Sequence, residues 1–358
     1  MTQLNFRFKF ITAAALCSLL FSTMFFACKK DDDPADIVDQ ACLTNNIAIA
    51  QALYDGSVEG TKPGEYVVGS RTDLKTILDA AIVVSNTSTA TQADITNACD
   101  QLQAGINAFS ASLIHEIAEE NLIGFWKMNG NANDSSGKGN NGVLTIGHFY
   151  FGAGSVTPTL DRFGRPDMAY HFDHGGNIEV PYTSTLNPQE MTLSIWCKKD
   201  TAGRTINADT YTLMSLNRWN GYKYQLQSAN KFFYTVHAIN GADTVYYDKD
   251  DETAVLDNGV WYHGVVTYKS GEMNFYVNGD LVKSWTDVPG TPITVPSTIN
   301  FVIGQDLPTS YYLTSDLTGN QLVDYGGFWT GDLDDAMFYN TALDATQVKS
   351  IFDNQNTL

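Results

Sequence analysis

Residues 261–281 read WYHGVVTYKSGEMNFYVNGDL, and this stretch decides the fold class. Two runs rich in β-branched and aromatic residues, 262–268 and 273–277, are followed by the dipeptide Asn278-Gly279. Asn-Gly is preferred in two-residue hairpin turns, because both turn positions need a positive φ. The stretch therefore predicts consecutive antiparallel strands.

The same pattern continues on both sides, over residues 121–358. Short β-branched and aromatic runs alternate with clusters of Gly, Asn, Asp and Pro, which is typical of an all-β domain. We expect strands at 122–126, 168–172, 192–198, 222–226, 232–237, 262–268, 273–277, 299–303 and 333–339. Asp344 and Gln347 form a capping-box pattern, so a short helix should close the chain.

Residues 36–118 have the helical period instead. Apolar residues recur every three or four positions after Thr91, and again after Ser70, which suits an N-cap. A breaker cluster at 59–66 separates the first helix from the second. We therefore expect a small bundle of three antiparallel helices, a spacer ahead of the β-domain. The segment resembles the small helical repeat that precedes sugar-handling domains in Bacteroidetes surface proteins.

The cysteines do not form a metal motif. Cys42 and Cys99 fall in the first and third expected helices, where they either pair or are small core residues. We favour core residues, because two helical cysteines seldom match disulfide geometry. Cys197 lies in an apolar strand and should be a core thiol. Without a CxxC or Cys/His cluster, zinc is not expected.

The first 34 residues are expected to direct export. A basic start and an apolar run at 10–26 are typical of a secretory signal, here residues 1–27. The run ends at Cys28 and is followed by an acidic tether, residues 28–35. This resembles a bacterial lipobox with the acidic export signal of Bacteroidetes surface lipoproteins, which implies lipidation of Cys28 and an outer-membrane, cell-surface location. An uncleaved anchor helix and ordinary cleavage after Ala27 are the alternatives.

The charge balance disfavours a nucleic-acid partner. The 358 residues carry 21 Lys and Arg against 40 Asp and Glu, a formal net charge of −19. A protein that neutralises phosphates needs a basic stripe, and the longest Lys/Arg cluster here is the pair Lys29-Lys30.

Six blocks of the β-region fall in the order and spacing of a known family. They are 125–137, 161–164, 169–173, 261–263, 276–279 and 331–335. Residues 121–358 thus resemble the laminin-G-like jelly rolls of the concanavalin A superfamily. The resemblance implies two packed antiparallel sheets, one of them concave. The expected fold class is an all-β jelly-roll sandwich, residues 121–358, preceded by a three-helix bundle, residues 36–118.

The loop 129–142 concentrates the side-chain and turn carbonyl oxygens that Ca²⁺ prefers, and Asp134 and Gly137 are its candidate contributors. The family resemblance implies that the Asp134 loop meets an acid of the last strand, Asp334 or Asp335, at a structural calcium ion. Strand alternation predicts that these two acids lie on opposite faces. A plain Asx-rich hairpin loop is the alternative.

Catalysis is not expected. Sugar-cleaving jelly rolls resembling this chain need paired carboxylates in E-x-D-x-x-E or E-x-D-x-E, and neither pattern occurs. The segment that comes closest to these patterns is residues 248–252. It should be a solvated hairpin tip, since it has no apolar residue. His263 should be a hydrogen-bonded sheet residue rather than a general base. A glycoside hydrolase or polysaccharide lyase is the lowest-ranked alternative.

Aromatic residues in loops suggest a binding function. A ring beside amide and guanidinium donors suits the stacking and hydrogen bonding of sugars. The candidate ligand contacts are Arg218, Trp219, Tyr222, Tyr312 and Trp329. We expect a noncatalytic carbohydrate-binding domain whose partner is a glycan or polysaccharide. The alternative is a protein-binding or adhesive surface domain on the same scaffold.

Overall fold

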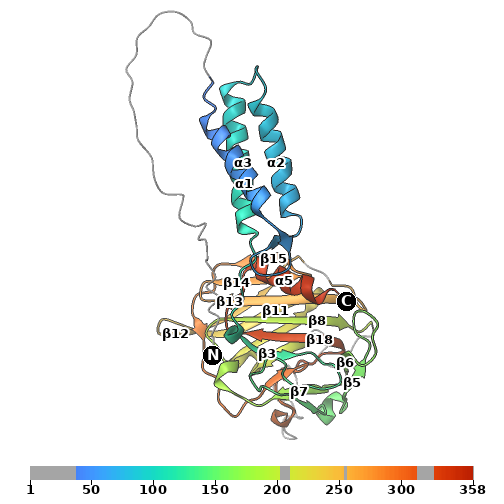
Figure 1. Ribbon diagram of the computed structural model, residues 1–358. Coiled ribbons are helices and arrows are strands. Elements are labelled where there is room, and N and C mark those ends of the chain that lie inside the picture. Colours follow the sequence, from blue (N-terminus) through green and yellow to red (C-terminus); the bar gives the residue numbers. More distant parts are fainter. Residues whose placement is uncertain (1–37, 202–209, 254–255, 313–325, 358) are drawn as a thin grey trace, which may run out of the picture. The chain divides into compact units, whose positions relative to one another are not determined.

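A computed structural model describes residues 38–201, 210–253, 256–312 and 326–357 (Figure 1). The expected signal peptide, the acidic tether and Cys28 lie outside these residues. Among the described residues, no helix combines the length and the apolar character needed to cross a bilayer.

Three helices precede the β-region, as predicted. They are α1 (Ala41–Gly56), α2 (Ser70–Ser85) and α3 (Gln92–Ala111), and a parallel pair of two-residue strands, β1 (Glu59–Gly60) and β2 (Tyr66–Val67), lies between α1 and α2. Each helix buries one apolar stripe. Thr91 caps α3 in a capping box with Asp94. The predicted N-cap of α2 is wrong by one residue, because Gly69 adopts a φ of 98° and ends the preceding turn in its place.

A disulfide joins α1 to α3 through Cys42 and Cys99, whose Cα atoms are 6.1 Å apart. The favoured interpretation of these residues as unpaired core positions is therefore wrong. The apolar stripes identify which face of each helix is buried, but they do not fix how one helix is shifted along the other. That shift decides whether two cysteines meet.

We expect the Cys42→Ser/Cys99→Ser variant to lose about 2–4 kcal/mol of unfolding free energy. The bridge restricts the conformations of the unfolded chain, and without it the unfolded state gains entropy. The two cysteines are 57 positions apart. Denaturant titration of both chains measures the loss. Mass spectrometry of unreduced peptides is the control, and recovery of Cys42 and Cys99 in separate peptides would contradict the prediction.

Within the described residues, the β-region forms two eight-stranded antiparallel sheets. Sheet I has the order β12 (Asp243–Asp250), β11 (Lys231–Asn240), β10 (Tyr222–Gln227), β9 (Tyr211–Leu216), β17 (Phe301–Ile303), β7 (Asn177–Val180) and β4 (Val143–Thr145), with β16 (Thr291–Pro292) beside β11. Sheet II has the order β15 (Asp280–Trp285), β14 (Glu272–Val277), β13 (Trp261–Lys269), β8 (Met191–Lys199), β18 (Gly331–Tyr339), β6 (Ala169–Phe172) and β5 (Val156–Thr159), with β3 (Leu122–Trp126) beside β18.

The predicted sandwich is confirmed, and each predicted strand is present within three residues of its expected ends. Asn278 and Gly279 take φ values of 53° and 84° and join β14 to β15, as the Asn-Gly signal predicts. Residues 248–250 are not a hairpin tip. They end the edge strand β12, where a strand can be polar because it is covered on one side only.

Alternate residues of both sheets face each other and form one core. Its largest members include Trp126, Tyr222, Tyr234 and Phe301, all fully buried. Helix α5 (Ala345–Gln355) follows β18, and the predicted Asp344–Gln347 capping box is present at its start. The Phe352 ring of α5 stacks at 5.6 Å on Trp196, so the helix covers part of the outer face of sheet II (Figure 1).

Candidate functional site

The five predicted ligand contacts do not share one environment. Tyr222, Tyr312 and Trp329 are only 0%, 2% and 0% exposed, so the expectation that these rings are available to a ligand is wrong. Tyr222 and Trp329 belong to the sandwich core, and the Tyr312 ring packs against Phe151. Aromatic residues in a loop look available in the sequence, but loops that fold back onto a sheet bury them.

Arg218 is also buried, at 1% exposure, and it anchors the loop after β9. Its Nε donates to Oδ2 of Asp306, and one Nη donates to the Tyr312 hydroxyl at 3.3 Å. The backbone of Asn217 and Arg218 has φ values of 62° and 53°, a sharp left-handed turn. This anchored turn begins the short 3₁₀ helix Arg218–Asn220, which presents the half-buried Trp219.

Lys223 lies next to Trp219. Its Nζ is 5.8 Å from the Trp219 ring and 5.9 Å from the ring of Phe233. In the part of the chain that the structure describes, the ammonium makes no ion pair or hydrogen bond. Burial lowers the pKa of Lys223 and the Arg218 charge lowers it further, while Asp306 and Asp248 oppose both effects.

Strand pairing extends this site across sheet I. Lys223 of β10 is opposite Thr235 of β11, which is opposite Asp248 of β12. The hydroxyl of Thr235 donates to Asp248 at 2.6 Å. His237 stacks on Tyr246 with ring centroids 4.0 Å apart. Because the alternate residues of β10 and β11 enter the core, these side chains share the outer face.

We call this surface the Lys223 face, formed by Trp219, Lys223, Phe233, Thr235, His237, Tyr246 and Asp248. Both ring nitrogens of His237 are buried without a hydrogen-bond partner in the described residues. Buried polar groups normally find a partner, so this surface has unmet hydrogen-bonding capacity beside aromatic rings. Rings with adjacent donors and acceptors suit a polyhydroxylated ligand.

Of the seven members, the sequence identified only Trp219 as a site residue. The others come from the runs KYQ at 223–225, FYTVH at 233–237 and YYD at 246–248, in which core-facing residues alternate with outward-facing ones. Alternation along β10 and β11 could have identified the outward set. It could not have shown that β10, β11 and β12 bring these residues into one row.

Asp134, expected to contribute to a calcium site, instead accepts hydrogen bonds from the backbone of its own loop and of the strand before it. One oxygen of Asp134 accepts the backbone N–H groups of Phe125 and Ser136, and the other accepts that of Asn140. Burial opposes ionisation, but the hydrogen bonds outweigh it and lower the pKa of Asp134. Gly137 supplies a turn residue with a φ of 81°. The carboxylate thus organises its own loop.

Asp334 and Asp335 both face Arg162, whose guanidinium donates to them at 2.6 and 2.9 Å. The expectation that they lie on opposite faces is wrong, because a bulge interrupts β18 at this point and Asp335 has a φ of 44°. Burial and the neighbouring Asp335 charge raise the pKa of Asp334 to about 8.

These residues do not fit a calcium ion. The oxygens of Asp134 accept backbone N–H groups, while Asp334 and Asp335 share an arginine. Across the described residues, no group of three or more His, Cys, Asp or Glu side chains is arranged to hold a metal. Asp334 and Asp335 are neighbouring carboxylates with little exposure, and the Arg162 guanidinium donates to both of them.

The other candidate catalytic groups are engaged in the structure. His263 is fully buried, its Nε2 lies 2.8 Å from the Ser194 hydroxyl, and burial lowers its pKa to about 3. This agrees with the predicted role of a hydrogen-bonded sheet residue. Asp250 accepts the backbone N–H of Glu252, whose carboxylate pairs with Lys283. None of these groups combines access with a nearby partner for acid–base chemistry.

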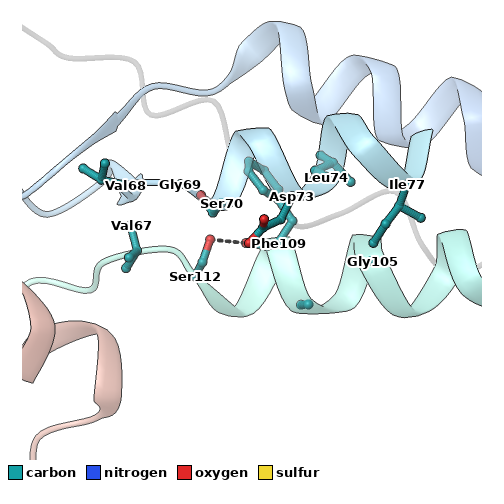
Figure 2. A pocket seen from close by; sticks show the side chains of 11 residues that line it. Val67, Val68, Gly69, Ser70, Asp73, Leu74, Ile77, Gly105, Phe109 and Ser112 are labelled. Carbon is teal, nitrogen blue, oxygen red and sulfur yellow. Dashed lines mark hydrogen bonds between the residues drawn. The ribbon is translucent and has the colours of Figure 1, made fainter. Parts of the chain in front are cut away.

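One of the described cavities, shown in Figure 2, lies between α2 and α3. It has a volume of about 280 Å³, its apolar walls include Val67, Ile77 and Phe109, and Asp73 is its titratable side chain. Its lining offers no pair of groups for acid–base chemistry, so we do not assign a site there.

A family model described as the concanavalin A-like lectin/glucanases superfamily matches residues 172–349. The matched region begins at the end of β6 and ends within α5, and it includes every residue of the Lys223 face. The match agrees with the two-sheet fold described above. No curated protein matches this chain in sequence.

Several solved structures are similar to the chain. One is domain 4 of AbnA, a GH43 extracellular arabinanase from Geobacillus stearothermophilus, in complex with arabinotriose, with 16% identity and a TM-score of 0.45 over 64% of this chain and 98% of that domain. Another is the binding domain of Paraclostridial Mosquitocidal Protein 1, with 17% identity and a TM-score of 0.45 over 66% and 53%. The botulinum neurotoxin serotype G binding domain has 16% identity and a TM-score of 0.45 over 66% and 51%. The chain thus spans about half of each toxin domain.

Proposed function

We propose that this chain is a lipid-anchored cell-surface protein that binds a glycan through the Lys223 face without cleaving it. The observation behind the proposal is the combination of half-buried rings with polar groups that have no partner among the residues that the structure describes, His237 and Lys223 above all. A polyhydroxylated ligand offers CH groups to the rings and hydroxyls to the polar atoms. The matched family includes lectins as well as glucanases.

The proposed location rests on the signal-like N-terminus and the lipobox-like Cys28. The Cys42–Cys99 disulfide supports export, because disulfides persist in oxidising compartments and are rare in the cytosol. In this proposal the helical segment serves as the spacer between anchor and sandwich. Labelling intact cells with [³H]palmitate, with Cys28→Ser as control, tests the anchor.

We expect Trp219→Ala to weaken glycan retention by about tenfold, since it removes the ring on which a sugar would stack. Affinity electrophoresis of the purified chain through gels containing a panel of polysaccharides measures retention. Trp261→Ala is the matched control, because Trp261 is also half-buried and also lies near a lysine, Lys198, but on sheet II.

Equal weakening by both tryptophan variants would contradict the Lys223 face as the site. Release of reducing ends from any polysaccharide in the panel would contradict the noncatalytic proposal. Retention of the unmodified chain on no polysaccharide would contradict glycan binding itself.

A protein-binding function is the second candidate, and a different surface favours it. Residues 143–160 contain no Asp, Glu, Lys or Arg, and they include the edge strand β4. Val143, Ile146 and Phe149 are 60%, 64% and 56% exposed there. Exposed apolar patches of this kind mark interaction surfaces. The test applies if the chain binds no glycan. Beads coated with the unmodified chain should then attach to cells, and beads coated with the Ile146→Asp/Phe149→Asp variant should not.

A further inference from the structure

We infer that the Lys223 face selects acidic glycans, with a carboxylate or sulfate group of the sugar as the counter-ion of Lys223. This inference rests on the proposed glycan-binding function and adds the class of ligand to it. It follows from the Lys223 ammonium, which has no ion-pair partner among the described residues.

Lys223 differs from the other half-buried lysines of the two sheets, because each of the others has a polar partner. Lys199 donates to the side chain of Asn230, Lys231 donates to the backbone carbonyl of Glu252, and Lys269 pairs with Glu272. Lys198 pairs with Asp332 at 2.5 Å, Lys249 with Asp287 at 3.0 Å, and Lys283 with Glu252 at 2.5 Å. The Lys223 ammonium has no such partner in the described residues. A charge that leaves water without a partner is unfavourable, so an incoming anion that pairs with it would be favoured.

The nearest acids are already occupied. Asp306 accepts hydrogen bonds from Arg218 and from the Tyr312 hydroxyl, within a buried cluster. Asp248 accepts the Thr235 hydroxyl at 2.6 Å. Both carboxylates act on Lys223 at longer range, where they oppose the lowering of its pKa, but neither supplies a direct contact. The vacant position at the ammonium therefore suits an anion from outside the chain.

The surroundings of the ammonium suit an anion carried by a sugar ring. Trp219 and Phe233 place aromatic faces on either side of Lys223, and these would bind the apolar face of a pyranose. The unpartnered nitrogens of His237 can then bond hydroxyls on the same residue or the next. A simple inorganic anion would use Lys223 alone and gain nothing from the rings.

Salt dependence separates this recognition from general ion exchange. The chain carries a formal net charge of −19, so a polyanion is repelled at long range. Added salt screens that repulsion strongly and screens a half-buried ion pair less. We therefore expect retention on an acidic polymer to persist as sodium chloride rises from about 0.05 to 0.3 M, a range that dissolves nonspecific ionic complexes.

The test compares polymers that differ only in charge. The purified full chain is applied to immobilised polygalacturonate and to its methyl ester, and to dextran sulfate and dextran, so that carboxylate and sulfate are distinguished. The readout is the ratio of the two affinities within each pair. We expect a ratio of about ten or more for at least one pair, the gain from a charged hydrogen bond.

Lys223→Met should bring that ratio close to one, and Lys223→Arg should retain it. Lys249→Met is the matched control, since it removes an ion-paired lysine of β12, two strands away in the same sheet, and should leave the ratio unchanged. Equal affinity for acidic and neutral polymers, or an unchanged ratio in Lys223→Met, overturns the inference and leaves glycan binding intact. Retention of the unmodified chain on no polymer of the wider panel overturns both.

Discussion

Replacing Arg162 with methionine is expected to lower the free energy of unfolding by about 3–5 kcal/mol, the cost of leaving buried charges uncompensated. The Arg162 side chain is 6% exposed and donates to Asp334 and Asp335, whose side chains are 3% and 17% exposed. Methionine keeps much of the volume and removes the positive charge. Two carboxylates would then remain buried next to each other.

The same side chain holds the C-terminal helix in place. Arg162 donates to the backbone carbonyl of Gln355 in α5, and its guanidinium lies 4.4 Å from the Trp196 ring. The indole N–H of Trp196 donates to the Gln355 side chain at 2.9 Å. Loss of Arg162 should therefore expose Trp196 as well, which a red shift of the fluorescence of the native state would detect.

Urea titration measures the loss, and Arg165→Met is the matched control. Arg165 pairs with Asp161 alone among the described carboxylates, and its side chain is 47% exposed. The buried carboxylate of Asp161 also accepts the backbone N–H groups of Phe163 and Arg165, which remain in the variant, so we expect a loss of only about 1 kcal/mol. Similar losses in the two variants would contradict the role assigned to Arg162.

The effect of Arg162→Met should also depend on pH. The pKa of Asp334 is raised from 3.8 to about 8, so between these values the folded state binds more protons than the unfolded state. The stability that Asp334 contributes is therefore present at low pH and is lost as the pH rises through about 8. With a proton on Asp334 the pair carries one negative charge fewer, so the cost of removing Arg162 should be smaller at pH 5 than at pH 8. An equal cost at both values would argue against a proton on the pair.

The parts of the fold that the sequence predicts are those with local causes. The strands of residues 261–281 follow from β-branched and aromatic runs, and their turn from the positive φ that Asn278 and Gly279 tolerate. The cap at Asp344 likewise depends on a residue three positions away, Gln347. Each of these features was predicted because every group that determines it lies within a few residues.

The features that the sequence did not predict depend on contacts between distant segments. Asp334 and Asp335 share Arg162, about 170 positions earlier, and only the bulge in β18 allows both to reach it. In the sequence Tyr312 is an ordinary loop residue. In the structure its hydroxyl accepts a hydrogen bond from Arg218, 94 positions away. Lys223 is one polar residue of an alternating strand. It can be identified as unpaired within the described residues only once the partners of the neighbouring acids, Asp306 and Asp248, are known.

The second large effect is expected at Arg218, which we assign as a positioning residue for Trp219. Arg218→Met should lower the free energy of unfolding by about 3–5 kcal/mol, because Asp306, itself 1% exposed, loses its counter-ion. Glycan retention should fall at the same time. The left-handed turn at Asn217 and Arg218 is held by the guanidinium, and Trp219 follows directly.

A double variant separates the two effects. In Arg218→Met/Asp306→Asn the buried charge is removed together with its partner, and replacing a whole buried pair is often close to neutral for stability. We therefore expect most of the unfolding free energy to return, measured by urea titration. Retention on the glycan should stay low, because the guanidinium that packs against the Trp219 ring is still absent. Recovery of both properties would mean that Arg218 acts on binding through overall stability, and recovery of neither would mean that the loop folds through Arg218 itself.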